Sequence, residues 1–210
     1  MRNFSEREYE TLLAQSGIIE QDGYGVKVLC LPDGNFLKTF WYRRTVSSRR
    51  IYPEWLRFKH NAGVLTRRGI PTVTVLETVR IPHLKRSGVI YRPLAGRTLR
   101  QVDADGEFSA QTAARAGAFI AELHRKGIHF RSLHFGNVLL CPDGAFGLID
   151  ISRMETVPWP LCAWTRRRNL AGLFRYPQDV EILERAGMQS FMSGYGERNK
   201  SLIVALKQFS

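Results

Sequence analysis

Two Pro-Asp-Gly triplets, each lying between two β-like runs, constrain the fold of this chain more than any other feature. Each triplet consists of residues that favour a turn. Proline fixes its φ angle, the aspartate side chain can hydrogen-bond to the nearby backbone, and glycine accepts a positive φ. The flanking runs are Val26–Leu31 and Asn35–Phe40 around the first triplet (Pro32-Asp33-Gly34), and Asn137–Cys141 and Phe146–Ile151 around the second (Pro142-Asp143-Gly144). The sequence therefore predicts one tight antiparallel hairpin in each half of the chain.

The rest of the chain divides into a β-rich and an α-rich part. Periodicity and capping residues predict the following elements: a helix opened by a Ser5/Glu8 capping box and ended by Gly17, a helix over about Arg50–Arg68, strands over Pro71–Arg80 and Gly88–Arg92 with a turn near Arg86-Ser87, a helix over Ser109–Lys126, a loop over Ile128–Gly136, and a basic, helical tail. The order β-β-α-β-β followed by helices predicts an α+β chain of two lobes, 1–92 and 93–210, that meet near Pro93–Thr98 around a cleft.

Composition narrows the class of protein. The 210 residues are 44% hydrophobic, which is enough to bury a core in one large domain or two intimate lobes. No apolar run reaches the ~18 residues of a membrane helix, and the charged N-terminus has no signal-peptide core. Three widely spaced cysteines (Cys30, Cys141 and Cys162) without a CxxC argue against a disulfide framework or a zinc site. A reducing, cytoplasmic location is expected.

The charge balance points to anionic partners. Thirty-one Lys+Arg against nineteen Asp+Glu give a formal net charge of +12, and arginines gather in two clusters, Arg43-Arg44 with Arg49-Arg50 and Arg166-Arg167-Arg168. The planar guanidinium favours phosphate and carboxylate groups. Charge alone does not distinguish between three possible partners: nucleic acid, an anionic membrane and a phosphorylated substrate.

The second hairpin suggests a metal site. Asn137 and Asp150 lie at similar distances from its tip on opposite strands, so they are expected to be neighbours at its open end. Asp150 interrupts an apolar strand, where an isolated carboxylate would be costly to bury. An amide oxygen beside a carboxylate suits Mg²⁺, which takes few protein ligands and completes its shell with phosphates and water. On the hairpin alone, a loop-capping Asp150 and a turn-stabilising Asn137 explain the pattern equally well.

The first half holds a second set of candidates. Lys38 is the single cation in an apolar strand, and Glu54 is the only acidic residue between Lys38 and Glu77. Gly23 and Gly25 form a G-x-G-x-x-V pattern before the first hairpin. Each feature has a structural explanation as well: an edge lysine extends to solvent, an acidic residue favours a helix start, and glycine pairs form turns.

In this order, the features resemble the protein-kinase-like fold. The segment Phe130-Arg131-Ser132-Leu133-His134-Phe135-Gly136-Asn137 is similar to the kinase catalytic loop H-R-D-L-x-x-x-N, and more closely to the H-G-D-L-H-x-G-N of aminoglycoside and lipopolysaccharide kinases. Asp150 stands where the D-F-G aspartate belongs. Glu54-Trp55, with Arg68-Gly69-Ile70-Pro71-Thr72, resembles the lipopolysaccharide core kinases, in particular the short group called toluene tolerance proteins. The resemblance covers about Gly23 to Tyr176 and implies a bilobal fold with a shortened C-lobe.

The resemblance also implies a role for each matched residue. Gly23 and Gly25 would cover the ATP phosphates, Lys38 would contact them, and Glu54 would hold Lys38. Tyr91, Arg92 and Pro93 would form the hinge that receives the adenine. Asn137 and Asp150 would hold Mg²⁺. The implied substrate is a sugar hydroxyl of an anionic, phosphorylated glycolipid, reached at the cytoplasmic face of the inner membrane by a peripheral protein.

One departure bears on activity. Ser132 stands where the family has its catalytic aspartate, and Phe130 replaces the motif's histidine. A serine is no carboxylate base, and general-base assistance is worth about 10²–10⁴-fold. Beside Arg131 in this loop, His134 is the candidate substitute. An active kinase and a pseudokinase that binds nucleotide without transfer are therefore the two main hypotheses. A nucleic-acid binder is the least favoured, because no nucleic-acid-reading motif is present.

Overall fold

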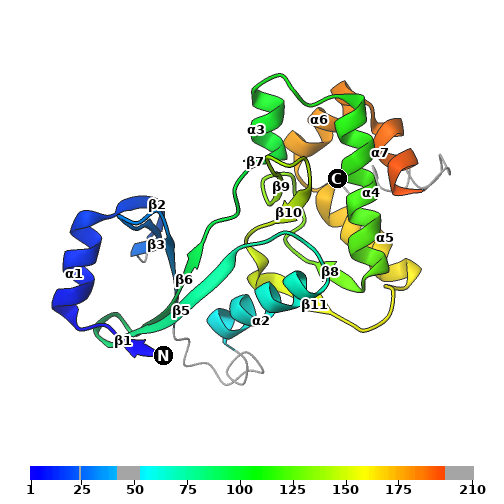
Figure 1. The fold of residues 1–210 in the computed structure, drawn as a ribbon. Helices are drawn as coiled ribbons and strands as arrows, with labels where there is room; N and C mark the ends of the chain where they lie inside the picture. The colour runs from blue at the N-terminus through cyan, green and yellow to red at the C-terminus, as the bar shows by residue number, and fades with distance from the viewer. Residues whose placement is uncertain (24, 42–52, 197–210) are drawn as a thin grey trace. The chain divides into compact units, whose positions relative to one another are not determined.

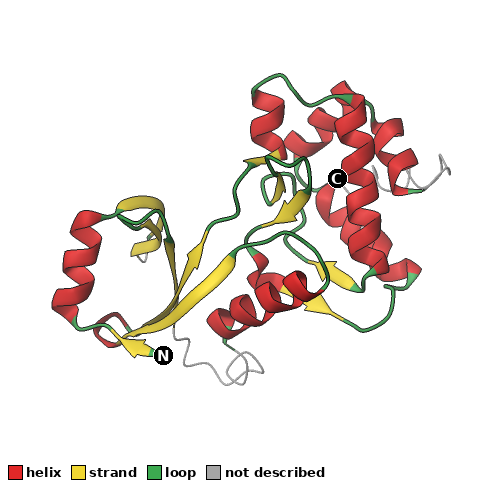
Figure 2. Ribbon diagram, viewed as in Figure 1, coloured by secondary structure: helices red, strands yellow, loops and turns green. Residues whose placement is uncertain are grey.

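The computed structural model describes residues 1–23, 25–41 and 53–196, and every structural statement below refers to these residues. The first arginine cluster, at 43–50, lies outside them. The chain forms two compact units, Met1–Leu94 (unit 1) and Ala95–Ser210 (unit 2), which we describe separately. Strands dominate unit 1 and helices dominate unit 2 (Figure 2). None of the described helices has the length and apolarity needed to cross a lipid bilayer.

Unit 1 is built on a six-stranded sheet with the order β1-β5-β6-β4-β3-β2. Its elements are β1 (Arg2–Asn3), α1 (Glu6–Gln15), β2 (Gly17–Asp22), β3 (Gly25–Cys30), β4 (Phe36–Trp41), α2 (Glu54–Arg67), β5 (Thr74–Ile81), the 3-10 helix η2 (Pro82–Leu84) and β6 (Arg86–Arg92). All neighbouring strands are antiparallel except β1 and β5, which are parallel. The capping box that opens α1 is confirmed, with Ser5 and Glu8 bonded to each other's backbone N–H groups.

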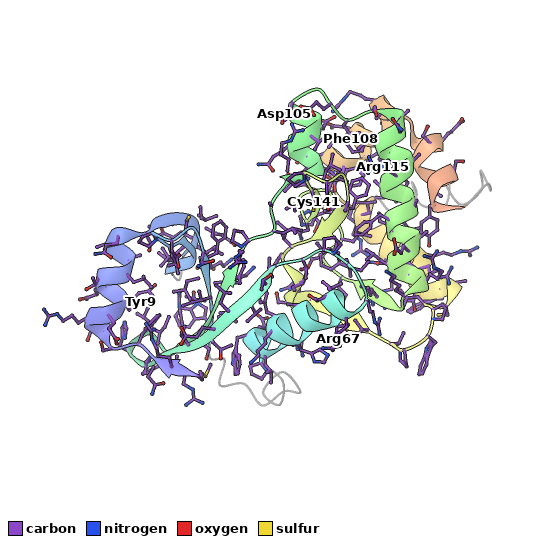
Figure 3. The ribbon with its side chains drawn as sticks, in the orientation of Figure 1. Tyr9, Arg67, Asp105, Phe108, Arg115 and Cys141 are labelled. Carbon is purple, nitrogen blue, oxygen red and sulfur yellow. The ribbon has the colours of Figure 1, made fainter. Side chains whose placement is uncertain are left out.

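Two helices cover opposite faces of this sheet, as Figure 1 shows. Side chains alternate along β4, so Leu37 joins the core under α1 that contains Tyr9, a residue labelled in Figure 3. Phe40 faces the other way and lies 6.0 Å, ring centre to ring centre, from Phe58 of α2. Phe58 also contacts Tyr91 of β6 at 5.2 Å. The central strand β4 is therefore packed on both faces.

The structure corrects two expectations for unit 1. Gly17 does not only end α1: it begins β2, a strand that the sequence did not reveal because its side chains are almost all exposed. The turn expected near Arg86-Ser87 lies earlier, at η2, and both residues belong to β6. Pro82 starts this turn, and Lys85 closes it in the left-handed region with φ +52°. The first hairpin is confirmed.

Unit 2 is a bundle of helices with two small sheets. Its elements are β7 (Arg97–Thr98), α3 (Leu99–Ala104), α4 (Ala110–Arg125), β8 (Ile128–Phe130), β9 (Val138–Leu140), β10 (Phe146–Leu148), the 3-10 helix η3 (Ile151–Arg153), β11 (Met154–Thr156), α5 (Ala163–Leu173), α6 (Pro177–Ala186) and α7 (Met188–Tyr195). The strands β7, β9 and β10 form one sheet, and β8 pairs with β11. The predicted helix over Ser109–Lys126 is confirmed, with its two end residues as the caps of α4.

The second hairpin forms as predicted, with Val138 opposite Leu148, but its second strand is shorter than expected. The strand ends at Leu148, so Asp150 does not interrupt it and instead precedes η3. The segment expected as a loop over Ile128–Gly136 also begins with a strand, β8, because β11 supplies a pairing partner far along the chain.

Glycines allow α4 and α7 to pack closely. These two helices run side by side in unit 2 (Figure 1). A Cβ atom at Gly117 would meet the carbonyl oxygen of Phe191, and one at Gly194 would meet the carbonyl oxygen of Ala114. Because the obstructing atoms are backbone, no side-chain rotation can make room. The close approach of the helices therefore requires glycine on both of them.

We expect Gly194→Ala to lower the free energy of unfolding by about 1–3 kcal/mol, because the added methyl forces α4 and α7 apart. Gly172→Ala is the matched control. Gly172 also lies within a helix, α5, but apart from its chain neighbours and the backbone of its own helix, none of the described residues comes within 4 Å of the added Cβ. Alanine should there leave stability unchanged or raise it by up to about 1 kcal/mol. Chemical denaturation measures both; equal effects of the two substitutions would contradict the packing account.

Candidate functional site

In unit 1, Lys38 lies on the face of the sheet that packs against α2. It occupies the middle of β4, opposite Val28 and Val89, and its neighbour two residues on, Phe40, contacts α2. Glu54 is the first residue of α2 and precedes Phe58 by four positions, which puts both on one helix face. Within the described parts of the chain, no ion pair joins Lys38 to Glu54. Their pairing stays a prediction for the nucleotide-bound protein.

The glycine turn connects β2 to β3. Gly25 has φ +108°, a backbone conformation that residues with a side chain rarely adopt. A Cβ atom at this position would also lie only 3.3 Å from Nη2 of Arg86. Gly23 has no such restriction, since beyond its chain neighbours no atom of the described residues lies within 4 Å of the place that a Cβ would take. Glycine is therefore required at position 25 and only accepted at position 23.

The expected adenine-binding residues lie at the end of unit 1. Tyr91 and Arg92 are the last residues of β6, and Pro93 follows the strand. The Tyr91 ring is buried against Phe36 and Phe58, at centre distances of 5.8 and 5.2 Å. This side chain belongs to the core, so any contact with a base would come from the backbone. That contact stays a prediction.

In unit 2, Asn137 organises the loop from Arg131 to Asn137. Its side-chain Nδ2 donates to the carbonyl oxygen of Ser132 at 2.9 Å, and its backbone N–H donates to the carbonyl oxygen of His134 at 2.9 Å. The first bond uses the Nδ2 group and fixes the orientation of the amide. The other polar atom of the side chain, Oδ1, is an oxygen that can act as a metal ligand. The Ser132 hydroxyl makes no hydrogen bond to the described residues. The loop thus presents a serine hydroxyl and an oriented amide oxygen.

Asp150 lies next to this loop. Ile149 donates its N–H to the carbonyl oxygen of Asn137 at 3.1 Å, which places Asp150 one residue beyond a direct backbone contact with Asn137. Asp150 has φ +50° and ψ +49°, a left-handed conformation that is uncommon for a residue with a side chain and that tends to occur at functional sites. A carboxylate and an oriented amide oxygen are hard ligands and fit Mg²⁺.

His134 is packed against its neighbours. Its ring centre lies 4.7 Å from that of Tyr176, and its Nδ1 is buried without a hydrogen-bond partner among the described residues. Burial lowers the pKa of His134, and the charge of Arg100 lowers it further, whereas Asp179 and Asp150 act in the opposite direction. A neutral imidazole can accept a proton. Because Nδ1 is enclosed, Nε2 is the atom that would have to do so.

The exposed guanidinium of Arg131 forms an ion pair with Glu155 at 3.2 Å. Both side chains are more than half exposed, so the pair contributes little to stability. The backbone N–H of Arg131 donates to the carbonyl oxygen of Arg153. Arg131 is therefore held against β11 rather than directed at Ser132.

Asp179, near the start of α6, supports the loop and was not anticipated from the sequence. Its carboxylate is fully buried; Oδ1 accepts from Arg100 Nε at 2.7 Å, and Oδ2 accepts from the backbone N–H of Phe135 at 2.8 Å. Arg100 lies on α3, 79 positions earlier in the chain. A fully buried carboxylate needs such partners. An acidic residue at a helix start after Pro177 is explained by the helix dipole alone, so no separate signal marked it in the sequence.

A second buried network holds the start of the loop. Asn169 of α5 donates from Nδ2 to the carbonyl oxygen of Phe130 at 2.7 Å, and its Oδ1 lies 3.0 Å from Nε2 of His124. Since Oδ1 only accepts, His124 carries its proton on Nε2, and its Nδ1 accepts from the hydroxyl of Tyr195 at 2.8 Å. Burial lowers the pKa of His124 to about 4. The neutral side chain of Asn169 fits a neutral His124.

Two other features lie apart from these residues. A hollow of about 630 Å³ lies between α2 and β5 in unit 1, and none of the predicted site residues lines it. No group of three or more His, Cys, Asp or Glu with metal-binding geometry occurs within residues 1–23, 25–41 and 53–196. The candidate site in unit 2 is therefore the Arg131–Asn137 loop with Asp150 and its supporting side chains.

Comparisons with known proteins identify the fold. No protein-family model matches the chain, and no curated protein matches its sequence. A solved structure described as a divergent kinase lacking the glycine-rich loop, which regulates membrane ultrastructure of the Toxoplasma parasitophorous vacuole, matches 99% of this chain and 87% of its own, with 16% identity and a TM-score of 0.54. The bifunctional kinase-methyltransferase WbdD matches 83% of this chain and 45% of its own, with 19% identity and a TM-score of 0.45. The chain has a protein-kinase-like fold of the α+β class.

The His124 network predicts a specific pH dependence of stability. The folded state holds His124 neutral with a pKa of about 4, whereas an unfolded histidine has its ordinary value of 6.5. Between these values the unfolded chain binds more protons, so the free energy of unfolding falls as pH falls from 6.5 to about 4, by roughly 3 kcal/mol in total. Above pH 6.5 this contribution is complete.

Urea unfolding across this pH range measures the effect. His124→Gln should flatten the slope between pH 6.5 and 4, even though the variant is less stable at neutral pH. His60→Gln, which replaces an exposed histidine of α2, is the control and should keep the wild-type slope. A His124→Gln slope as steep as that of the wild type would show that other groups cause the acid sensitivity.

Proposed function

We propose that this protein is an ATP- and Mg²⁺-dependent phosphotransferase that acts on a sugar hydroxyl of the lipopolysaccharide core or of a related envelope glycolipid. The observation that carries the proposal is the placement of Asn137 and Asp150. In a kinase-like fold, the Asn137 amide is oriented by Ser132, and Asp150, whose backbone is left-handed, follows a residue that hydrogen-bonds the Asn137 backbone, beside a loop that buried side chains hold in place. Phosphoryl transfer needs such positioning and charge neutralisation more than covalent chemistry.

The residues of unit 2 have distinct tasks. Asn137 and Asp150 would hold Mg²⁺, which when bound supplies positive charge to the phosphates. Ser132 would lie beside the acceptor hydroxyl, and its own hydroxyl can hydrogen-bond that group without removing its proton. His134, neutral because of burial and the nearby Arg100, would take the proton at Nε2 if the enzyme uses a base.

The tasks of unit 1 rest on the resemblance to kinases. The backbone around Gly23 and Gly25 would contact the nucleotide phosphates. Lys38 would bind them, with Glu54 as its ion-pair partner once nucleotide is present. The backbone of Tyr91, Arg92 and Pro93 would receive the adenine.

The substrate class follows from charge and from the sequence resemblance. The motif around Ser132 and the Glu54-Trp55 segment are similar to those of lipopolysaccharide core kinases and of the toluene tolerance group. A formal net charge of +12, with an arginine run in α5, suits an anionic and already phosphorylated acceptor. Such an acceptor would be reached from the cytoplasm, by a protein peripheral to the inner membrane.

A pseudokinase is the second candidate function, and Ser132 favours it. The loop keeps the metal-binding residue types but has no carboxylate at the position of the family's base. A chain of this kind could bind nucleotide and act as a scaffold without transferring phosphate. The two hypotheses agree on nucleotide binding and differ on turnover.

We expect Asp150→Asn to abolish Mg²⁺-dependent ATP binding, because the amide keeps the shape and accepts the left-handed backbone but removes the anionic ligand. Calorimetric titration measures the affinity, and thermal unfolding without ligand verifies the fold. Asp143→Asn is the matched control: Asp143 lies at the tip of the same hairpin, and an amide oxygen can still accept from the N–H of Ala145. Wild-type affinity for Mg²⁺–ATP in Asp150→Asn would refute the metal assignment.

Ser132→Asp separates the two hypotheses. If transfer is slow only because proton removal is unassisted, the new carboxylate should raise ATP turnover by about tenfold or more, with little change in nucleotide affinity. Ser132→Asn, which has the same shape without a base, should give no increase. If the wild type binds ATP and neither variant turns it over, the pseudokinase hypothesis is correct. If the wild type is already fast and Ser132→Asp slows it, another group such as His134 is the base.

A further inference from the structure

Unit 2 exposes two tryptophans, Trp159 shortly before α5 and Trp164 in the first turn of α5. Trp159 and Trp164 are 64% and 66% exposed, the two highest fractions among the exposed large hydrophobic residues that the structure describes. Tryptophan is a highly buried residue on average, so two exposed indoles five positions apart suggest a surface that something covers.

This segment is firmly attached to the unit. Leu161 donates its N–H to the carbonyl oxygen of His124, and Val157 donates to that of Gly127, both at 2.9 Å. Arg166 Nε donates to the carbonyl oxygen of Leu161 at 2.7 Å. The two indoles are therefore presented by a chain segment that is pinned to the C-terminal end of α4.

The surroundings of the indoles are cationic. No acidic residue occurs between Glu155 and Asp179, and the same stretch contains four arginines. Two of these arginines, Arg167 and Arg168, are exposed and lie three and four positions after Trp164, on its face of α5. The Arg168 guanidinium lies over the Trp164 ring at 5.3 Å.

We propose that Trp159, Trp164, Arg167 and Arg168 form a surface, here called the Trp–Arg surface, that docks unit 2 on an anionic phospholipid bilayer. Indole rings favour the boundary between headgroups and acyl chains, because their bodies are apolar and their N–H groups stay hydrated. Exposed arginines beside them attract anionic headgroups, and their stems can cover apolar surface.

The stacked guanidinium distinguishes this partner from nucleic acid. Binding of single strands uses free aromatic faces on which bases stack. Arg168 already covers one face of Trp164, whereas an indole lying at a bilayer surface needs no free face. An acidic protein would use the arginines but gives no reason for two exposed indoles.

The Trp–Arg surface is close in the chain to the candidate site. It begins shortly after β11, and the partner of β11, β8, leads directly into the loop at Arg131. Docking through this surface would thus hold the loop near the membrane. The proposal rests on one part of the proposed function, a protein peripheral to a membrane, and names the surface that would bind there; its test requires neither nucleotide nor transfer.

Vesicle sedimentation of the full chain, without nucleotide, tests the proposal. We expect binding to vesicles of phosphatidylcholine mixed with phosphatidylglycerol, weaker binding to phosphatidylcholine alone, and a loss of affinity as salt rises. The double variant Trp159→Ala/Trp164→Ala should reduce the partition coefficient by about tenfold or more. Trp41→Ala is the matched control, because Trp41 is also exposed and also lies against an arginine, Arg86, but belongs to unit 1.

Three results would overturn the proposal. The first is equal vesicle binding by the double variant and the wild type, with both shown to be folded by thermal unfolding. The second is an equal loss of binding in Trp41→Ala. The third is tighter binding to a single-stranded oligonucleotide that depends on the same two tryptophans and displaces the vesicles, which would make nucleic acid the partner. Because ATP is absent, none of these results bears on phosphotransfer.

Discussion

The buried carboxylate of Asp179 is the interaction on which the candidate site depends. One oxygen accepts from Phe135 in the loop, and the other accepts from Arg100 on α3. Removal of the carboxylate would leave a buried N–H and an arginine without their partner, a costly arrangement. Because Asp179 lies on α6, it ties three segments that are distant in the sequence to one point.

Two further contacts complete the support of the loop. Asn169 holds the carbonyl oxygen of Phe130 just before the loop, and Asn137 holds that of Ser132 within it. The loop is therefore fixed at its start, its middle and its end by buried or partly buried hydrogen bonds. Preorganisation of this kind is what phosphoryl transfer requires, and here it surrounds a serine, Ser132, rather than a carboxylate.

Local signals in the sequence predicted the local structure well. The Pro-Asp-Gly triplets placed both hairpins, and the second hairpin brought Asn137 next to the residue before Asp150. The strand β2 escaped prediction because its exposed side chains have no apolar alternation. The turn that was expected near Arg86-Ser87 also lies elsewhere in the structure. Ser87 and Gly88 are residue types that favour turns, but pairing with β4 and β5 keeps both in the strand β6.

Long-range contacts explain the rest of what the sequence could not predict. Asp179 lies 44 positions from Phe135, and Asn169 lies 45 positions from His124. Each is a single polar residue in a helix, where exposure is the ordinary expectation, and only the fold reveals that it is buried. The tryptophans of the Trp–Arg surface are the reverse case. Tryptophan is ordinarily expected in the core, and only the fold reveals that these two are exposed.

Hydrogen–deuterium exchange with and without Mg²⁺–ATP tests the central claim most directly, namely that the supported loop and Asp150 form the nucleotide and metal site. The account predicts slower exchange in residues 131–150, including the amides of Phe135, Asn137 and Ile149, when Mg²⁺ and ATP are present together, and little change with ATP alone. Saturating Mg²⁺–ATP that protects only the arginine-rich start of α5, and leaves residues 131–150 unchanged, would show binding by surface charge and contradict the account.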